Sequence, residues 1–287
     1  MLSTNKSHHL LIWWDFPTFV LAMDTTHNTS QQRSLVLDIG KDHLGYLSWG
    51  GSNAVESGSI AFDSSLDDYR QALENAVYDN TFLLEDYDRT LIAVHSQHFT
   101  LLPQQLVDNG LAEKVMRASF TTLEGDFLTH PIAGTDAAIA CDVPLGVVGF
   151  LRRTFTGASV MHHLVPLCSY CVKSYAEETA CMHISLFDNE ARIVVVKQGK
   201  LQMANTFTYR ALEDVAYYAL NMWKTCSLES RRDKVMLTGD NEPREQLAEQ
   251  LRQWIAYVMP EVIPAQVMQF GRDAMTIPFN LITTALL

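Results

Sequence analysis

The stretch "LVLDIGKDHLGYLSWGGSNAVESGSIAF", residues 35–62, decides the fold. It reads as an apolar strand, a polar turn, an alternating strand, a glycine-rich turn and a third strand. The stretch "CMHISLFDNEARIVVVKQGKLQMANTFTY", residues 181–209, repeats that order, with turns at 188–189 and 198–199. We therefore expect two antiparallel meanders of three strands in one chain.

The repeat continues beyond the meanders. An amphipathic helix is expected after each of them, over 65–80 and over 211–226, and each helix is followed by a compact apolar strand, 90–95 and 234–239. Aligning Asp38 with Ser185 keeps the three strands and the helix in register, and the fifth element follows in the same order. Because five elements recur in one order, the pattern indicates an internal duplication and an α/β fold of two lobes.

The expected domains are an N-terminal extension over 1–32, a first lobe over 33–155 and a second lobe over 156–287. The boundary is placed near residues 145–160, where the sequence "PLGVVGFLRRTFTGAS" is rich in glycine and turn residues, ahead of a helix expected over 160–178. A further helix is expected over 242–258, with an apolar stripe made by Leu247, Leu251, Trp254, Ile255 and Val258.

The apolar segment "LLIWWDFPTFVLA" at 10–22 loosely resembles a secretory signal, but Asp15 and Pro17 interrupt it and it is too short to span a bilayer. We expect residues 1–22 to be a loosely attached extension or to precede the natural start. A signal peptide is the alternative, and it would change the compartment.

Composition excludes some classes of protein. A formal net charge of −12, with no cluster of basic residues, excludes a nonspecific nucleic-acid binder. Five cysteines, an odd number in a chain of this size, favour reduced thiols and a cytoplasmic location. Cys168 and Cys171, with Cys181 and His183, could be interpreted as a zinc site. Their helical spacing with apolar neighbours favours buried core positions, so no metal site is expected.

Two lobes that each open with a three-stranded meander resemble the actin-like ATPase superfamily, whose lobes are ribonuclease-H-like. The segment "FTLLPQQLV" at 99–107 is similar to one in the pilus and secretion assembly branch of that superfamily. The nearest resemblance is to a small bacterial family of unknown function with the same fold. It covers nearly all of residues 33–287 and rests on element order.

The resemblance implies a nucleotide site made of three elements. Active members carry Asp-x-Gly followed by a hydroxyl residue in the first turn, a second such turn in the other lobe, and a Gly-Gly pair after a later strand. Asp38 and Gly40 match the first turn, but Lys41 and Asp42 replace the hydroxyl residue. Ser185 stands where the second carboxylate should be, in a turn that contains no glycine.

The third element keeps Gly239 but has Asp240 in place of the second glycine. If a nucleotide binds, its contacts are therefore Asp38, Gly40 and Gly239. Added carboxylates near the phosphates would repel them, so we favour the interpretation that Asp38 ends a strand and caps its own turn.

Other catalytic motifs are absent. The chain has no G-x-x-x-x-G-K-[ST], G-x-G-x-x-G, G-x-S-x-G or H-E-x-x-H sequence. His95 and His98 flank the end of a predicted strand and are interpreted as structural. Asp136 and Asp142 could be cast as a base toward a substrate hydroxyl, but polar residues at a strand edge explain them equally well.

The favoured hypothesis is a non-catalytic binding or assembly module with a degenerate nucleotide-binding site and no cofactor. The alternative is a divergent ATP-binding protein, an ATPase or small-molecule kinase, with ATP and Mg²⁺. A protein partner is expected, with no nucleic acid and no integral membrane segment. The final segment, 274–287, is expected to pack on the second lobe, as the resemblance implies.

Overall fold

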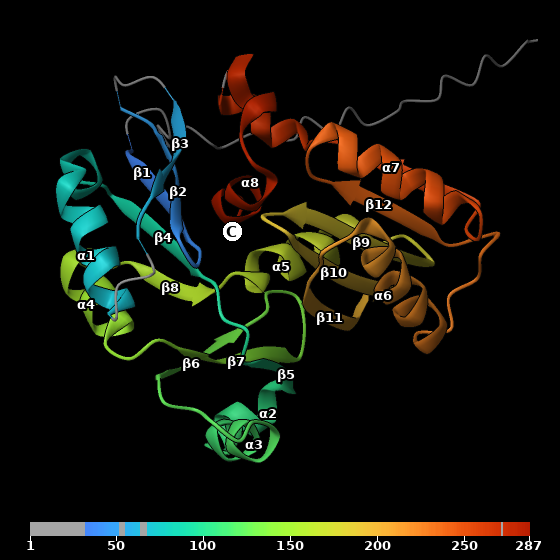
Figure 1. The fold of residues 1–287 in the computed structure, drawn as a ribbon, viewed down its shortest axis with the longest axis horizontal. Coiled ribbons are helices and arrows are strands. Elements are labelled where there is room, and N and C mark those ends of the chain that lie inside the picture. The colour runs from blue at the N-terminus through green and yellow to red at the C-terminus, as the bar shows by residue number, and fades with distance from the viewer. Residues whose placement is uncertain (1–31, 52–54, 64–67, 271) are drawn as a thin grey trace, which may run out of the picture.

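The computed structural model describes residues 32–51, 55–63, 68–270 and 272–287. The expected N-terminal extension, apart from residue 32, lies outside these ranges. The described chain forms two five-stranded sheets, one in each lobe, and a smaller three-stranded sheet below them (Figure 1).

The first sheet has the order β3-β2-β1-β4-β8. Its strands are β1 (Ser34–Ile39), β2 (His43–Trp49), β3 (Glu56–Ala61), β4 (Arg89–Val94) and β8 (Ser159–His162). The first three strands form the expected antiparallel meander, and β4 and β8 continue the sheet in parallel with β1. On the side away from the second lobe lie α1 (Tyr69–Asp79) and α4 (Val147–Thr154), with a short 3₁₀ turn η1 (Thr81–Leu84) after α1 (Figure 1).

The second sheet has the order β11-β10-β9-β12-β13 and repeats that topology. Its strands are β9 (Ala180–Phe187), β10 (Glu190–Lys197), β11 (Lys200–Thr208), β12 (Lys234–Thr238) and β13 (Tyr257–Pro260), accompanied by α6 (Leu212–Thr225) and α7 (Asn241–Arg252). Asp38 lies opposite Gly45 in the first meander, and Ser185 lies opposite Arg192 in the second. The two hairpins therefore share one register.

A small subdomain interrupts the first lobe between β4 and α4. It contains β5 (Phe99–Pro103), α2 (Gln104–Asp108), α3 (Ala112–Ser119), β6 (Asp126–Pro131) and β7 (Ala137–Val143), with strand order β5-β7-β6. It has its own apolar cluster around Leu102, Met116 and Ala140. This subdomain was not predicted, because its short strands carry no copy of the repeat.

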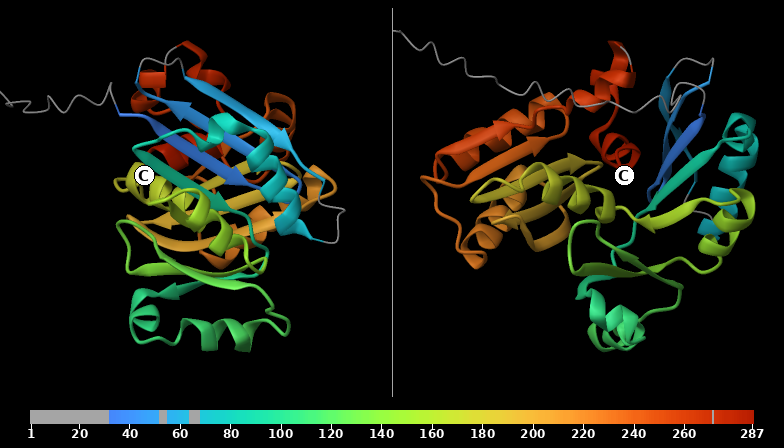
Figure 2. Two further views of the ribbon diagram at one scale, coloured as in Figure 1. Left: turned by 90° about the vertical axis from the view of Figure 1, so that its left-hand side faces the viewer. Right: turned by 180° about the vertical axis from the view of Figure 1, so that it is seen from behind.

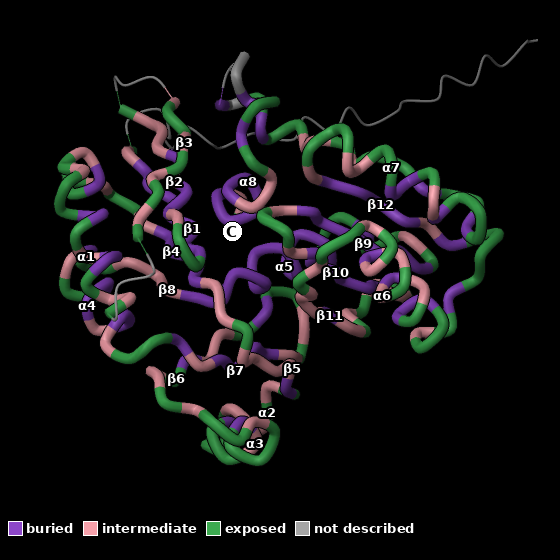
Figure 3. Tube along the Cα trace, viewed as in Figure 1, coloured by how far each residue is buried: buried purple, intermediate pink, exposed green. Residues whose placement is uncertain are grey.

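Two helices lie between the lobes, α5 (Leu164–Ser174) and α8 (Phe279–Ala285), and the C-terminus lies beside them (Figures 1 and 2). The 3₁₀ segments η2 (Ala265–Phe270) and η3 (Arg272–Thr276) precede α8. Nearly all of α5 and α8 is buried (Figure 3). Helix α8 contacts β1, β2 and β4 of the first lobe and also α5, which packs on β10 and β11, and Phe279 stacks on His183 of β9. The final segment therefore packs between the two lobes, and not on the second lobe alone as expected.

Three boundaries also differ from the predictions. The first sheet includes β8, which falls after the boundary expected at 155, and the crossing helix is correspondingly shorter. Helix α7 ends at Arg252, and the residues from 257 onward form an edge strand instead. Trp254 is 64% exposed, because it follows the helix end, whereas the other four residues of the predicted stripe are buried.

The main apolar core runs from the first sheet through α5 and α8 to residues of β10 in the second lobe, such as Val194 and Val196. A separate core lies between the second sheet, α6 and α7. Within the described residues, no helix combines the length and the apolar character that a membrane span requires.

Candidate functional site

Asp38 lies on β1 in the centre of the first sheet and is 1% exposed. His95, just after the neighbouring strand β4, places Nε2 3.0 Å from Asp38 Oδ1. The amide of Asn280 on α8 donates to the other carboxylate oxygen. The turn after β1 is closed instead by the main chain, from Gly40 N to His43 O. The prediction that Asp38 caps its own turn is therefore wrong, since its side chain joins β4 and α8.

Arg192 reaches this cluster from the second lobe. It lies on β10, is 2% exposed, and places Nη2 3.0 Å from His95 Nε2. The same nitrogen is 4.0 Å from Glu190 Oε2, and the guanidinium lies 5.2 Å from the centre of the Phe187 ring. A buried cation needs anionic partners. Here they are contributed by the two lobes, Asp38 from one and Glu190 from the other.

The repeat explains how the arginine comes to face Asp38. Gly45 lies opposite Asp38 in the first hairpin, whereas Arg192 lies opposite Ser185 in the second. At these equivalent positions, the first lobe has an aspartate and a glycine, whereas the second lobe has a serine and an arginine. The facing positions of the two hairpins therefore provide one carboxylate and one cation.

The electrostatics of the cluster favour ionised carboxylates. Burial raises the pKa of Asp38, but His95, Arg192 and Asn280 more than offset it and hold that pKa well below its ordinary value. Burial likewise opposes ionisation of Glu190, yet His95 and Arg192 lower its pKa. Burial lowers the pKa of His95, but the neighbouring carboxylates reverse the effect and raise it.

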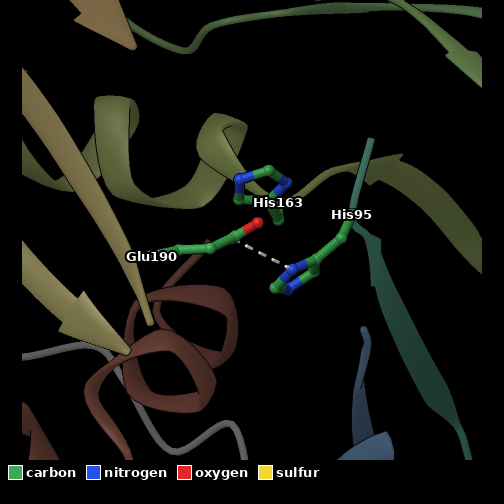
Figure 4. A group of neighbouring side chains, drawn as sticks. All are labelled: His95, His163 and Glu190. Atoms are coloured by element: carbon green, nitrogen blue, oxygen red, sulfur yellow. Dashed lines mark ion pairs between the residues drawn. The ribbon is translucent and has the colours of Figure 1, made fainter. Parts of the chain in front are cut away.

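Two further histidines lie against this cluster. The ring of His163, between β8 and α5, stacks on His95 with centroids 4.3 Å apart, and His162 packs on His163 at 4.2 Å. Figure 4 shows His95 and His163 beside Glu190, whose Oε2 lies 3.6 Å from His95 Nδ1. Burial lowers the pKa of His162 to about 3, and burial with nearby cationic groups lowers the pKa of His163 well below its ordinary value. Both rings are therefore neutral.

The two hairpin turns that would hold phosphates meet each other. The His43 ring lies between them, with Nδ1 3.0 Å from Asp42 Oδ1 and 3.6 Å from Asp188 Oδ2 in the turn of the other lobe. A Cβ on Gly40 would lie 2.7 Å from the same ring, so that glycine accommodates His43. An imidazole and two carboxylates thus occupy the space between the turns.

These residues do not fit a magnesium-bound nucleotide. Both oxygens of Asp38 are already hydrogen-bonded within the chain. A triphosphate between the turns would meet the carboxylates of Asp42 and Asp188, which are 61% and 48% exposed and so face solvent with their charge.

Gly239 has a structural explanation that involves no ligand. Its φ is +126°, a region that side chains disfavour, and a Cβ there would lie 2.6 Å from the carbonyl oxygen of Leu186 on β9. The glycine is required because β9 and the end of β12 approach closely. Asp240, which follows it, occupies the position just before α7.

A cleft of about 1500 Å³ opens beside these elements. Its walls come from the second hairpin turn, from His43 beside the first, from the start of α7 and from the segment that leads into α8. Charged residues on the walls include Asp188, Arg210, Asp240 and Arg244, and the apolar ones include Val262 and Met275, which are 75% and 64% exposed. The cleft is therefore amphipathic, with apolar side chains available to a ligand.

A second buried polar network lies in the second lobe. His183 on β9 is fully buried, with Nδ1 3.2 Å from Glu261 Oε2 and Nε2 3.1 Å from Thr238 Oγ1. Tyr175 donates to the same carboxylate. This network accounts for His183, a candidate zinc ligand in the sequence.

Cys168 and Cys171 lie in the core, as their spacing predicts, whereas Cys226 is only partly buried. Cys168 and Cys171 are fully buried on α5, and all five thiols are free. Among the described residues, two groups could hold a metal ion: His95, His163 and Glu190, and the more exposed Asp42, His43 and Asp188. Neither group includes a cysteine.

The remaining candidates from the sequence lie apart from the Asp38 cluster, in the small subdomain. Asp142 accepts from the main-chain nitrogen of Gly125 and lies 3.9 Å from His98. The main-chain oxygen of Asp136 accepts from Gln104 at the start of α2. These contacts are structural ones.

Sequence reasoning placed neither Arg192 nor Asn280 at the site. His163 was a candidate only as a neighbour of the possible zinc site at the cysteines, and Glu190 only as a carboxylate of the second turn, and neither was expected beside Asp38. One signal was available, because Arg192 is a single charge inside the apolar run "ARIVVV". A charged side chain flanked by buried strand residues must itself be buried and needs a partner of opposite charge. Asn280 gave no signal, because only the packing of α8 brings it to Asp38.

Comparisons with known proteins give a family and a fold. The family model described as "Protein of unknown function (DUF3822)" matches residues 23–258. No curated protein matches the sequence. The chain is similar to a crystal structure from Bacteroides thetaiotaomicron, described as a protein with actin-like ATPase fold and unknown function. The identity is 22% and the TM-score 0.73, over 90% of this chain and 97% of that chain.

The chain is also similar to a structure of the PilM-PilN type IV pilus biogenesis complex. The identity is 14% and the TM-score 0.57, over 88% of this chain and 97% of that chain. These two likenesses confirm the expected actin-like ATPase fold.

Proposed function

The chain belongs to the DUF3822 family of proteins of unknown function, and on that premise we propose that it is a non-catalytic binding or assembly module that needs no nucleotide. The observation that carries the proposal is the cation supplied by Arg192 beside Asp38. In an actin-like nucleotide site, the equivalent carboxylate would be free to hold hydrated Mg²⁺. In this chain both of its oxygens are engaged by His95 and Asn280.

The proposed ligand of the cleft is a segment of a protein partner. Supporting it are the exposed apolar side chains of Val262 and Met275 beside the charges of Arg210 and Arg244, a combination suited to an extended peptide. The structural neighbour in the PilM-PilN complex is itself seen with a protein partner, which makes a partner for this chain a reasonable proposal.

The proposed location is the cytoplasm. Five free cysteines, four of them buried, are compatible with a reducing compartment, where disulfides are rare.

Titration calorimetry of the full-length protein with Mg·ATP tests the proposal. We expect no heat of binding at millimolar nucleotide, because phosphates would face Asp42 and Asp188 across His43. Asp38→Asn serves as the matched variant, since it keeps the shape of the side chain while removing its charge.

Binding in the micromolar range that is lost in Asp38→Asn would overturn the proposal. It would instead support the second candidate function, a divergent ATP-binding protein, for which the volume of the interlobe cleft is the favouring observation. Micromolar binding that Asp38→Asn leaves unchanged would overturn it equally, and would locate the nucleotide elsewhere.

A further inference from the structure

Three metal-ligating side chains converge at the junction of the lobes. His95 follows β4, His163 lies between β8 and α5, and Glu190 begins β10 (Figure 4). One ligand atom from each of them lies within 4.8 Å of the other two. They come from three separate parts of the chain, so the fold itself brings them together.

Two atoms of this group lack hydrogen bonds. His163 Nδ1 and Glu190 Oε2 are buried and have no hydrogen-bond partner among the described residues, and His163 is only 4% exposed. Buried polar atoms in proteins nearly always have a hydrogen-bond partner, because removing them from water without one costs free energy. The arrangement therefore leaves lone pairs free to bind a ligand.

The remaining nitrogens of both histidines are held by other residues. His95 Nε2 is 3.0 Å from the carboxylate of Asp38, and His163 Nε2 is 3.2 Å from Thr206 Oγ1. Histidines that ligate metals commonly have their second nitrogen fixed in this way, which sets the tautomer and the orientation of the ring.

We propose that His95, His163 and Glu190 form a binding site for a divalent transition metal of the zinc class that joins the two lobes. Two imidazoles and a carboxylate suit such a metal and leave a fourth position for water. Ligand atoms bound at about 2.1 Å lie about 3–3.5 Å apart. His95 Nδ1 and Glu190 Oε2, at 3.6 Å, already approach that separation, and His163 closes on them when the metal binds.

Arg192 is the internal competitor of the metal. Its Nη2 lies 4.0 Å from Glu190 Oε2, so its positive charge disfavours a second cation nearby. The cluster holds two carboxylates and this one guanidinium, a net charge of −1 when the imidazoles are neutral. Arg192 Nη2 also lies 3.4 Å from His95 Nδ1, so binding of the metal requires Arg192 to move away from both ligand atoms.

The test is Zn²⁺ binding by metal-free full-length protein, measured in competition with a chromogenic chelator. We expect one equivalent to bind, with affinity reduced roughly tenfold or more in Glu190→Gln and in His163→Ala. Arg192→Met is expected to bind Zn²⁺ more tightly, because the competing charge is gone. The absorption spectrum of bound Co²⁺ gives a second readout, and its visible bands should disappear in Glu190→Gln.

Matched controls separate this group from other histidines. His98 lies outside the group, and His43 belongs to the second candidate group. Neither His98→Ala nor His43→Ala should therefore change the affinity for Zn²⁺. A variant with His8 and His9 replaced by alanine tests whether histidines of the N-terminal segment bind the Zn²⁺ instead. Each variant is first shown to be folded by its circular dichroism.

The proposal fails if Zn²⁺ does not bind, or if Glu190→Gln and His163→Ala, both folded, bind it as tightly as the unchanged protein. Arg192→Met must bind Zn²⁺ more tightly than the unchanged protein does. Weaker binding would show that Arg192 does not compete with the metal. These results do not depend on Mg·ATP, so failure here leaves the proposed function standing.

Discussion

At the scale of single residues, a structural role and a nucleotide-binding role of Gly239 lead to different expectations. With φ at +126° and the Leu186 carbonyl 2.6 Å from a Cβ, Gly239→Ala strains the backbone and forces β9 and β12 apart. We expect a loss of about 2–3 kcal/mol in the free energy of unfolding, measured by urea denaturation. No nucleotide needs to be present.

The control for that substitution is Gly157→Ala. Gly157 also has a positive φ, +79°, but no atom lies within 4 Å of its Cβ position, so only the conformational cost of about 1 kcal/mol applies. Equal losses of unfolding free energy in the two variants would show that the close approach of β9 and β12 is not the reason for a glycine at position 239.

Glu261 gives a residue-scale prediction for pH. Burial raises its pKa, but hydrogen bonds from His183, Tyr175 and Tyr170, with the charge interaction of His183, lower it below the ordinary 4.5. A group whose pKa is lower in the folded state stabilises the protein above its unfolded pKa, and this contribution is lost as pH falls through the folded value. The gain is therefore present at neutral pH and disappears in acid.

Glu261→Gln removes this titration. We expect the variant to be less stable than the unchanged protein at pH 7, with the difference in unfolding free energy narrowing as the pH falls below about 4.5. Urea titrations across that range measure the difference directly. A difference that stays constant with pH would show that the network does not favour the ionised carboxylate.

At the scale of elements, α8 packs against the sheet of the first lobe. Leu281 is 1% exposed on its inner face, and α8 contacts β1, β2, β4 and α5. Leu281→Ala should cost about 3 kcal/mol of unfolding free energy, since a buried leucine leaves a cavity. Leu287→Ala, at a position 38% exposed, should change it by less than about 0.5 kcal/mol. Similar small losses in both would argue against this packing.

The elements also show what the sequence could predict. Both meanders, α1, α6, β4 and β12 follow from local apolar patterns and turn residues, which act over a few positions. The packing of α8 could not be predicted, because Leu281 and Ile282 are equally apolar toward either lobe. The Asp38 cluster could be predicted only in part. Asp38 was identified from its turn, whereas Arg192 and Asn280 reach it only through long-range packing.

At the scale of the whole molecule, the two lobes should unfold as one unit. The main core continues from the first sheet into β10 of the second lobe, and the buried charges of Asp38, His95, Arg192 and Glu190 span the junction. We expect a single urea transition, with coincident curves from tryptophan fluorescence and from circular dichroism. Trp49 reports on the first lobe and Trp223 on the second, so the fluorescence covers both.

Arg192→Met tests how far the charges contribute to that coupling. Removing one partner of a buried ionic cluster should lower the free energy of unfolding by about 3 kcal/mol, because Asp38 and Glu190 lose their shared cation. Since the apolar core still crosses the junction, the variant should keep one transition at a lower midpoint, with an unchanged slope against urea. Two separated transitions in the variant would mean that the charges, and not the core, hold the lobes together.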